Sequence, residues 1–214
     1  MTWSAAERSS RGACSTSRFD DVLILVRHAR TALNAVGRLQ GRTDAPLDEV
    51  GEQQAMALAD RLSAISTTRI LTSPLARARA TAAAIAERHG VTPEVDDNWI
   101  ELDYGELEGT PISEVDASVW ASWRENPEFA PVGGESFSQL DRRVHDACRR
   151  LREAAADADV IVVSHVSPIK SAVAWSMGAP TSIVHRMRLG QAAISRIDLS
   201  GANPVLVTFN EAPD

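Results

Sequence analysis

Cysteine is scarce in this chain. Only Cys14 and Cys148 occur among its 214 residues. A small secreted domain that depends on disulfides needs several cysteine pairs at regular spacings. The sequence therefore contains no disulfide framework, and we expect the protein to work in a reducing compartment.

Long apolar runs are also absent. No stretch approaches the roughly 20 apolar residues that a transmembrane helix requires. The N-terminal segment carries Arg8, Arg11 and Arg18 but has no apolar stretch of the kind that marks a secretory signal. Both absences predict a cytoplasmic protein without a membrane partner.

Positive charge is in deficit. The chain has 29 Asp and Glu residues against 22 Lys and Arg residues, which gives a net charge of −7 at pH 7. Nucleic-acid-binding domains show a basic face or stripe, so we expect no nucleic-acid partner. A locally basic pocket can still attract an anionic substrate on an acidic protein.

Sequence signatures of nucleotide and metal sites are missing as well. The chain contains neither a Gly-x-x-x-x-Gly-Lys-Ser/Thr loop nor a Gly-x-Gly-x-x-Gly loop. Its histidines, at positions 28, 89, 145, 165 and 185, form no close ligand pair and have no adjoining cysteine. We therefore expect a protein that uses no metal and no cofactor.

Short apolar runs alternate with helical patterns along the chain. Strands are expected at 22–26, 69–72, 95–101, 160–164, 192–197 and 205–209, the last two as a hairpin, and helices at 31–36, 51–65, 75–89, 135–156 and 166–177. Such alternation is typical of an α/β fold. We predict a three-layer α/β/α sandwich with a mainly parallel central sheet.

The expected domain spans 20–214. Residues 1–19, rich in Ser, Ala and Arg without a period, predict a flexible tail. Residues 102–134 are irregular, and the part from 110 onward has several Pro and Gly and carries Trp120 and Trp123. This segment fits a small cap over a pocket, although the two tryptophans fit core anchors on a short helix equally well.

Chemistry-bearing side chains directly follow three of the predicted strands. They are Arg27 and His28 after the first strand, residues 73–77 with Arg77 after the second, and His165 after the strand at 160–164. The carboxyl ends of parallel strands are where ligands bind in an open α/β sheet. Two histidines and two arginines gathered there, with Asn34 as a neutral donor, would suit a phosphoryl group. A solvated surface role is the competing interpretation for each residue alone.

A series of motifs in this order resembles the histidine phosphatase superfamily, which has the phosphoglycerate mutase-like fold. The motifs are Arg27-His28-Ala29-x-Thr31-x-x-Asn34, Gly37-Arg38-Leu39-Gln40-Gly41-x-x-Asp44-x-Pro46-Leu47, Ser73-Pro74-Leu75-x-Arg77-Ala78, Glu101-x-x-Tyr104-Gly105-x-x-Glu108-Gly109, Gly133-Gly134-Glu135-Ser136 and Val163-Ser164-His165. The resemblance covers residues 22 to 209. The run from Val166 to Lys170 after the second histidine is similar to the branch of broad acid phosphatases and α-ribazole phosphatases.

The resemblance implies a role for each matching residue. His28 would be the nucleophile that forms a phosphohistidine, and Glu101 would be the general acid and then the general base. The implied catalytic set is Arg27, His28, Arg77, Glu101 and His165, and the implied substrate-binding set adds Asn34, Gln40 and Gly41. Asp103 is the weaker candidate for the acid. The position just after His165, where some branches place the acid, is Val166, which supports Glu101.

Two residues depart from the family pattern. Ala29 replaces the usual glycine after the first histidine, and Arg30 replaces an acidic residue. We expect Arg30 to point to solvent. A basic residue beside the pocket, favouring a more strongly anionic substrate, is the alternative.

The leading function is a metal-independent phosphomonoesterase acting on phosphorylated small metabolites. A phosphoglycerate mutase would share the catalytic residues, but the short interval from Glu101 to Glu135 favours hydrolysis over the mutases' longer insertion. Two other hypotheses are a non-catalytic binding or regulatory module and a phosphoprotein phosphatase, which would need an open cleft. Dimers are common among relatives, so a homodimer is compatible with the resemblance.

Overall fold

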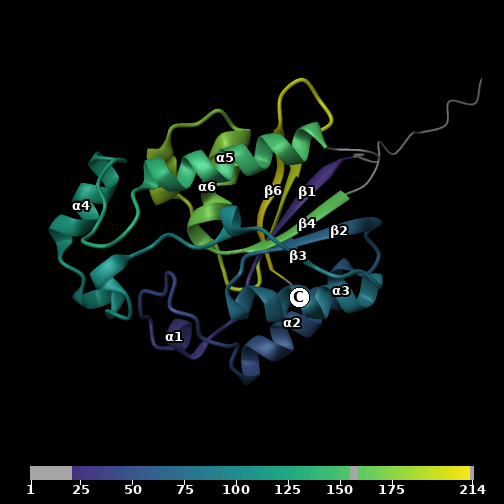
Figure 1. Ribbon diagram of the computed structural model, residues 1–214, viewed down its shortest axis with the longest axis horizontal. Helices are drawn as coiled ribbons and strands as arrows, with labels where there is room; N and C mark the ends of the chain where they lie inside the picture. The colour runs from purple at the N-terminus through teal and green to yellow at the C-terminus, as the bar shows by residue number, and fades with distance from the viewer. Residues whose placement is uncertain (1–20, 155–158, 213–214) are drawn as a thin grey trace, which may run out of the picture.

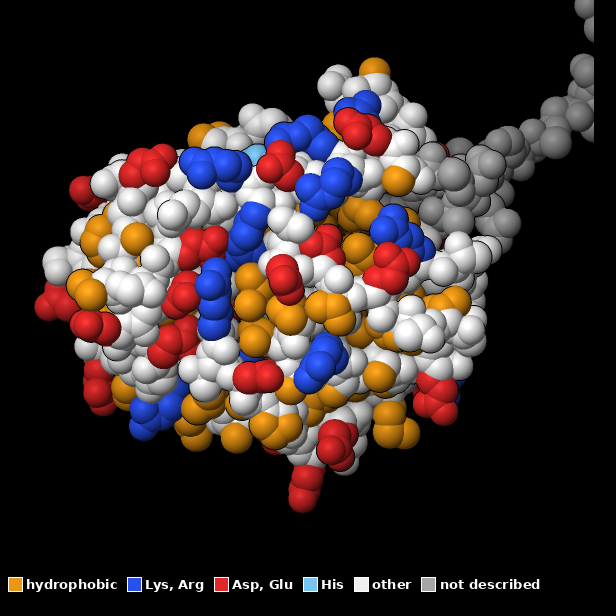
Figure 2. Space-filling model, in the orientation of Figure 1, with side chains coloured by type: hydrophobic (Ala, Val, Ile, Leu, Met, Phe, Trp, Pro, Cys, Tyr) orange, Lys and Arg blue, Asp and Glu red, His pale blue; other side chains and the backbone are white. Residues whose placement is uncertain are grey.

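The computed structural model describes residues 21–154 and 159–212. The predicted tail at 1–19 lies outside these residues. No helix in the described part of the chain is both long enough and apolar enough to cross a membrane. On the face shown in Figure 2, Lys and Arg side chains are interspersed with Asp and Glu side chains.

The described residues form one six-stranded sheet in the order β3-β2-β4-β1-β5-β6. Its strands are β1 (Val22–Arg27), β2 (Thr67–Thr72), β3 (Glu94–Val95), β4 (Asp159–Ser164), β5 (Ile194–Asp198) and β6 (Val205–Glu211). Strands β3, β2, β4 and β1 pair in parallel, whereas β5 pairs antiparallel with both β1 and β6. Among these strands only β5 runs against the others, so the prediction of a mainly parallel sheet is confirmed.

Helices cover both faces of the sheet (Figure 1). Helices α2 (Glu49–Leu62) and α3 (Ala76–His89) lie on one side, and α5 (Phe137–Glu153) and α6 (Val166–Ser176) lie on the other. Side chains of β1 alternate between the two cores: Leu23 and Leu25 pack in the core under α5 and α6, and Ile24 and Val26 in the core under α2 and α3. This two-sided burial explains the continuous apolar run and confirms the three-layer sandwich.

The helix ends follow local sequence signals. Asp48 caps the first turn of α2 by accepting from the Gly51 backbone N–H at 2.8 Å. Ser136 and Gln139 form a capping box at the start of α5. Gly90 ends α3 in the left-handed conformation, with φ of +65°, which glycine adopts without a steric penalty.

The segment from 102 to 134 leaves the sandwich at the end of the sheet. It contains the short turns η2 (Gly105–Leu107) and η3 (Ile112–Glu114) and the helix α4 (Ala117–Glu125), which lies apart from the sheet in Figure 1. Trp123 is 3% exposed and packs edge-on against Tyr104 and Phe129 and beside Trp120. Trp123 is therefore a core anchor on a short helix, Trp120 packs beside it partly buried, and both also line a cavity described below.

Two elements differ from the sequence-based expectation. The strand predicted at 95–101 is only the two-residue β3, followed by the turn η1 (Asp97–Trp99). The Asp96 carboxylate ends the strand by accepting from the Asn98 backbone N–H at 3.0 Å, and Trp99 then turns into the core with no exposed surface. A second turn, η4 (Thr181–Arg186), was not predicted. The short helix α1 (Ala32–Ala35) lies within the predicted helical turn.

Candidate active site

The carboxyl ends of β2, β4 and β1 meet because these strands are neighbours in the sheet. His28 follows β1 and His165 follows β4, and their ring centroids are 5.0 Å apart. His28 is 3% exposed and His165 is fully buried. The structure therefore brings together the two histidines that lie 137 positions apart in the sequence.

Backbone contacts fix the His28 ring in one tautomer. Its Nδ1 lies 2.7 Å from the Ala29 carbonyl oxygen, which can only accept, so Nδ1 carries the proton. The lone pair is then on Nε2. Burial first, and then the positive charges of Arg77 and Arg27, hold the pKa of His28 well below its usual 6.5. The ring is therefore neutral and its Nε2 is available as a nucleophile.

The His165 ring is oriented by Ser73. Its Nε2 lies 2.7 Å from Ser73 Oγ, which itself accepts from the Leu75 backbone N–H at 3.4 Å. The Ser73 hydroxyl proton is thus free to donate to Nε2, which puts the ring proton on Nδ1. Burial first, and then Arg77, lowers the pKa of His165 well below 6.5. His165 is a neutral hydrogen-bond donor in this arrangement.

Arg77, in the first turn of α3, is fully buried. Its Nη1 donates to the Thr43 carbonyl at 2.9 Å and its Nη2 to the Gly41 carbonyl at 2.6 Å. Arg79, two positions on, is exposed. The buried position of Arg77 explains why a cation stands at the start of this helix, where the helix dipole disfavours it.

Glu108 holds the same loop from the other side. Its carboxylate accepts from the backbone N–H groups of Gly41 at 3.1 Å, Arg42 at 2.8 Å and Thr43 at 3.2 Å, and from the Thr43 hydroxyl at 2.7 Å. These hydrogen bonds outweigh partial burial and lower the pKa of Glu108. A Cβ on Gly41 would lie 2.1 Å from Glu108 Oε1, so only glycine permits this approach.

Asn34 and Gln40 form a small amide network at the end of β1. Gln40 Oε1 accepts from the Thr31 hydroxyl at 2.7 Å and from Asn34 Nδ2 at 3.3 Å. Because the Gln40 oxygen is used in this way, its Nε2 donors point elsewhere. Thr31 and Asn34 themselves form a capping box on α1.

Four buried donors at the ends of these strands make no hydrogen bond with any described residue. They are Arg27 Nε, Gln40 Nε2, Arg77 Nε and His165 Nδ1. Each unpartnered buried donor costs about 1–3 kcal/mol. A tetrahedral oxyanion presents several acceptors and would relieve this cost, which fits a phosphate monoester better than a neutral ligand.

Glu101 lies next to these donors and is 3% exposed. Its carboxylate accepts from the backbone N–H of Leu102 at 2.8 Å and from those of Val166 and Ser167, both at 3.1 Å. The last two belong to the first turn of α6, so a helix N-terminus holds this carboxylate. Asp103 instead accepts from the Gly105 backbone N–H at 2.9 Å and pairs with Arg42 at 3.2 Å.

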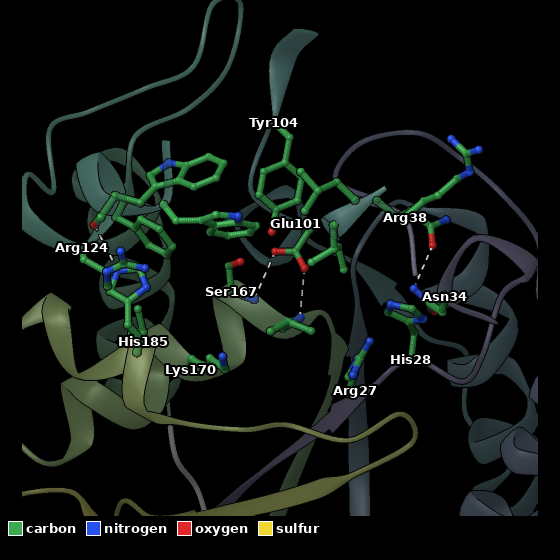
Figure 3. A pocket seen from close by; sticks show the side chains of 18 residues that line it. Arg27, His28, Asn34, Arg38, Glu101, Tyr104, Arg124, Ser167, Lys170 and His185 are labelled. Atoms are coloured by element: carbon green, nitrogen blue, oxygen red, sulfur yellow. Dashed lines mark hydrogen bonds between the residues drawn. The ribbon is translucent and has the colours of Figure 1, made fainter. Parts of the chain in front are cut away.

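A cavity of about 450 Å³ opens at this end of the sheet (Figure 3). Its lining includes five of the predicted substrate-binding residues, Arg27, His28, Asn34, Gln40 and Glu101. Gly41, Arg77 and His165 are not part of the lining. Figure 3 shows His28, Arg27 and Asn34 on one side of Glu101, and Lys170, His185 and Arg124 on the other.

Ala29 and Arg30 are not among the residues that line the cavity. Ala29 is fully buried, and its backbone N–H donates to Thr81 Oγ1 at 3.1 Å. The prediction was that Arg30 points to solvent. Its Nε instead donates to both Asp48 carboxylate oxygens, at 2.9 and 3.2 Å. Since Asp48 caps α2, this arginine fastens a helix end.

Sequence reasoning missed several residues that shape the site. Ser73 and Glu108 stood inside the quoted motifs without an assigned role. Lys170, His185 and Arg124 line the cavity from α6, η4 and α4. The spacing of Ser167 and Lys170, three positions apart on one helix, was the one signal that could have placed Lys170 beside the acid.

The chain matches a described family over nearly its whole length. Residues 23–212 match the histidine phosphatase superfamily (branch 1). A probable phosphoglycerate mutase, GpmB of Yersinia pestis, is 35% identical over 179 residues, which cover 81% of this chain and 83% of that protein.

Solved structures of phosphatases share the fold. A mycobacterial glucosyl-3-phosphoglycerate phosphatase superposes with a TM-score of 0.79 at 28% identity, covering 89% of this chain and 98% of that one. The α-ribazole phosphatase of Shigella flexneri gives a TM-score of 0.80 at 26% identity, covering 89% and 96%. Together with the two histidines, the two arginines and the carboxylate gathered at one end of the sheet, these similarities show that the chain belongs to the histidine phosphatase superfamily.

Proposed function

We propose that this protein hydrolyses phosphate monoesters of small metabolites through a phosphohistidine formed on His28. The observation that carries the proposal is the neutral His28 ring beside four buried, unpartnered donors. A nucleophile and an oxyanion cradle are what a two-step phosphoryl transfer requires from a protein. No cofactor is needed for either step.

In the first step, His28 Nε2 attacks phosphorus and the bond from phosphorus to the alcohol oxygen breaks. Glu101, in its protonated form, gives its proton to the departing oxygen. Arg27, Arg77 and His165 bind the phosphoryl oxygens, joined by Asn34, Gln40 and Gly41. The proposed alcohol site is therefore the part of the cavity beside Glu101.

In the second step, Glu101 is a carboxylate and removes a proton from water as the water attacks the phosphohistidine. The bond from phosphorus to Nε2 breaks, and inorganic phosphate leaves. The backbone N–H groups of Val166 and Ser167 at the start of α6 keep the Glu101 carboxylate oriented for this proton transfer. We further propose that residues 20–214 act as one domain capped by 102–134, in the cytoplasm and without a metal.

A phosphoglycerate mutase is the second candidate, because the Yersinia pestis relative carries that name. A mutase returns the phosphoryl group to a sugar-acid hydroxyl instead of water. The segment between Glu101 and Glu135, with only short turns and α4, is what favours hydrolysis here. A purely regulatory module is disfavoured because every predicted catalytic side chain is present.

The test is an assay of the full chain on p-nitrophenyl phosphate with EDTA present, beside His28→Ala. We expect phosphate release that persists in EDTA, is abolished by His28→Ala and is unaffected by His89→Ala at the far end of α3. Rapid quenching at alkaline pH should trap one acid-labile phosphohistidine in the wild type. Conversion of 3-phosphoglycerate to its isomer with little phosphate release would establish the mutase instead.

A further inference from the structure

Lys170 is the single lysine of the chain, and all the other residues counted as Lys or Arg are arginines. Lys170 lies on α6 and lines the cavity. Its side chain is partly buried, and within the described residues it makes neither an ion pair nor a hydrogen bond. Burial of the ammonium group lowers its pKa, attraction to the more distant Glu101 carboxylate offsets only part of this effect, and repulsion by Arg27 adds to it. An unpartnered, partly buried cation is costly and calls for an anionic partner.

The position of Lys170 relates it to the proposed acid. Ser167, three residues earlier, donates its backbone N–H to Glu101. Residues three apart on a helix share a face and are separated by about 4.5 Å along its axis. Lys170 therefore lies about one helical turn beyond the acid, on the cavity side of α6. Figure 3 shows it on the opposite side of Glu101 from His28.

The charges around Lys170 favour an anion. Among the described residues that line the cavity, Glu101 is the only carboxylate, and it already accepts hydrogen bonds from α6 backbone N–H groups. His185 donates from Nε2 to the Trp123 carbonyl at 3.1 Å, and burial lowers its pKa, so it is a neutral neighbour. Arg124 stands exposed at the rim. Lys170 is thus the main partly buried cation at this end of the cavity.

We propose that Lys170 binds a second acid group, a carboxylate or a phosphate, on the alcohol part of the substrate. The inference rests on the proposed function, because it places the alcohol beside Glu101. The substrates of this enzyme are then phosphate monoesters that carry two anionic groups a few bonds apart. The apolar walls, which include Trp120, Trp123 and Phe137, pack on the carbon atoms between them.

A matched series of three-carbon esters tests the proposal. The series is 3-hydroxypropyl phosphate, 3-(phosphonooxy)propanoate and propane-1,3-diyl bisphosphate, which differ only in the group distant from the ester. The first has a neutral end, the second a carboxylate and the third a second phosphate. The propanoate has no other hydroxyl, so it cannot be isomerised. The kcat/KM measured for the bisphosphate is divided by two before comparison, because either of its two equivalent phosphates can be hydrolysed.

The measured quantity is the selectivity, the kcat/KM for an acid-bearing ester divided by that for 3-hydroxypropyl phosphate. We expect a wild-type selectivity of at least tenfold for one acid-bearing ester, which also identifies whether carboxylate or phosphate is preferred. Lys170→Met should lower the selectivity at least tenfold, and Lys170→Arg should retain part of it. The matched control Arg186→Met, an exposed cation outside the cavity lining, should leave the selectivity unchanged.

Two outcomes overturn the proposal. A wild type without selectivity would show that no second acid is recognised. A Lys170→Met enzyme that is slower on all three esters by one factor would show that the lysine acts through Glu101. Inactivity of the wild type on these esters and on p-nitrophenyl phosphate would instead contradict the proposed function.

A binding measurement tests Lys170 without turnover. Reductive methylation with ¹³C-formaldehyde labels one lysine and the N-terminal amine, and Lys170→Arg identifies the lysine signal by its loss. In the His28→Ala protein, 3-(phosphonooxy)propanoate or the bisphosphate should shift the dimethyl-lysine signal more than 3-hydroxypropyl phosphate does. Equal shifts from all three esters would contradict the proposal even if the enzyme proved inactive.

Discussion

Glu108 and Arg77 hold opposite sides of the same loop. The Glu108 carboxylate accepts from backbone N–H groups of residues 41, 42 and 43, while the Arg77 guanidinium donates to the carbonyls of residues 41 and 43. The position of the buried Arg77 guanidinium therefore depends on how the Glu108 carboxylate holds this loop. Glu108 therefore positions the proposed phosphate clamp without lining the cavity.

Glu108→Gln should weaken the clamp. An amide replaces one accepting oxygen by a donor, which faces the N–H groups of the loop, so the loop and Arg77 shift. We expect kcat/KM on p-nitrophenyl phosphate to fall at least tenfold with a raised KM, and the free energy of unfolding to fall by about 2 kcal/mol. Glu106→Gln, on an exposed side chain two positions away, is the matched control. An unchanged KM in Glu108→Gln would contradict the positioning role.

Gln40→Glu should abolish the stabilisation of the folded protein by bound inorganic phosphate. Inorganic phosphate at one hundred times its Kd should raise the free energy of unfolding of the wild type by about 2.7 kcal/mol. The carboxylate of the variant has no donor for phosphate and adds a repelling charge. Urea unfolding with and without phosphate measures the difference, and Gln53→Glu on an exposed face of α2 is the control. Full protection of Gln40→Glu would sink the prediction.

Ser73→Ala should disturb the His165 tautomer. Without the hydroxyl, Nε2 loses its partner at 2.7 Å and the ring proton is no longer held on Nδ1. We expect kcat on p-nitrophenyl phosphate to fall about tenfold to a hundredfold, and the ¹⁵N shifts of the ring to report a mixed tautomer. Ser176→Ala removes another buried hydroxyl, one that bonds within its own helix, and should leave both readouts unchanged.

The lowered pKa values of His28 and His165 predict a pH-dependent stability. Below pH 6.5 the unfolded chain binds protons at these rings, and the folded chain does not. Stability from this source is complete above pH 6.5 and falls as the pH drops, by up to about 1.4 kcal/mol per pH unit for each ring. The free energy of unfolding, measured by urea unfolding at several pH values between 6.5 and 5, should change less steeply with pH for His165→Asn than for wild type. Equal slopes would contradict the assignment.

The sequence by itself determined the architecture. Val22–Arg27 and Asp159–Ser164 are buried on both faces, and such strands must be continuous apolar runs, which are easily recognised. The strand-end histidines and Arg77 follow from the same logic, since parallel strands end at one edge of the sheet. Gly90, with its positive φ, marked the end of α3 where the structure ends it.

Only the tertiary structure decided the rest. Whether 95–101 continued as a strand depended on the turn that Asp96 caps and on the core position of Trp99, not on local pattern. The pair of Arg30 and Asp48 joins residues 18 positions apart, and the hydrogen bond between Glu108 and Gly41 joins residues 67 positions apart. These contacts lie in loops, whose sequences have no hydrophobic period that could predict them. Lys170, His185 and Arg124 line one cavity because η4 packs against both α6 and α4. Periodicity reports which face of an element is buried, but it carries no information about which elements face one another across a pocket.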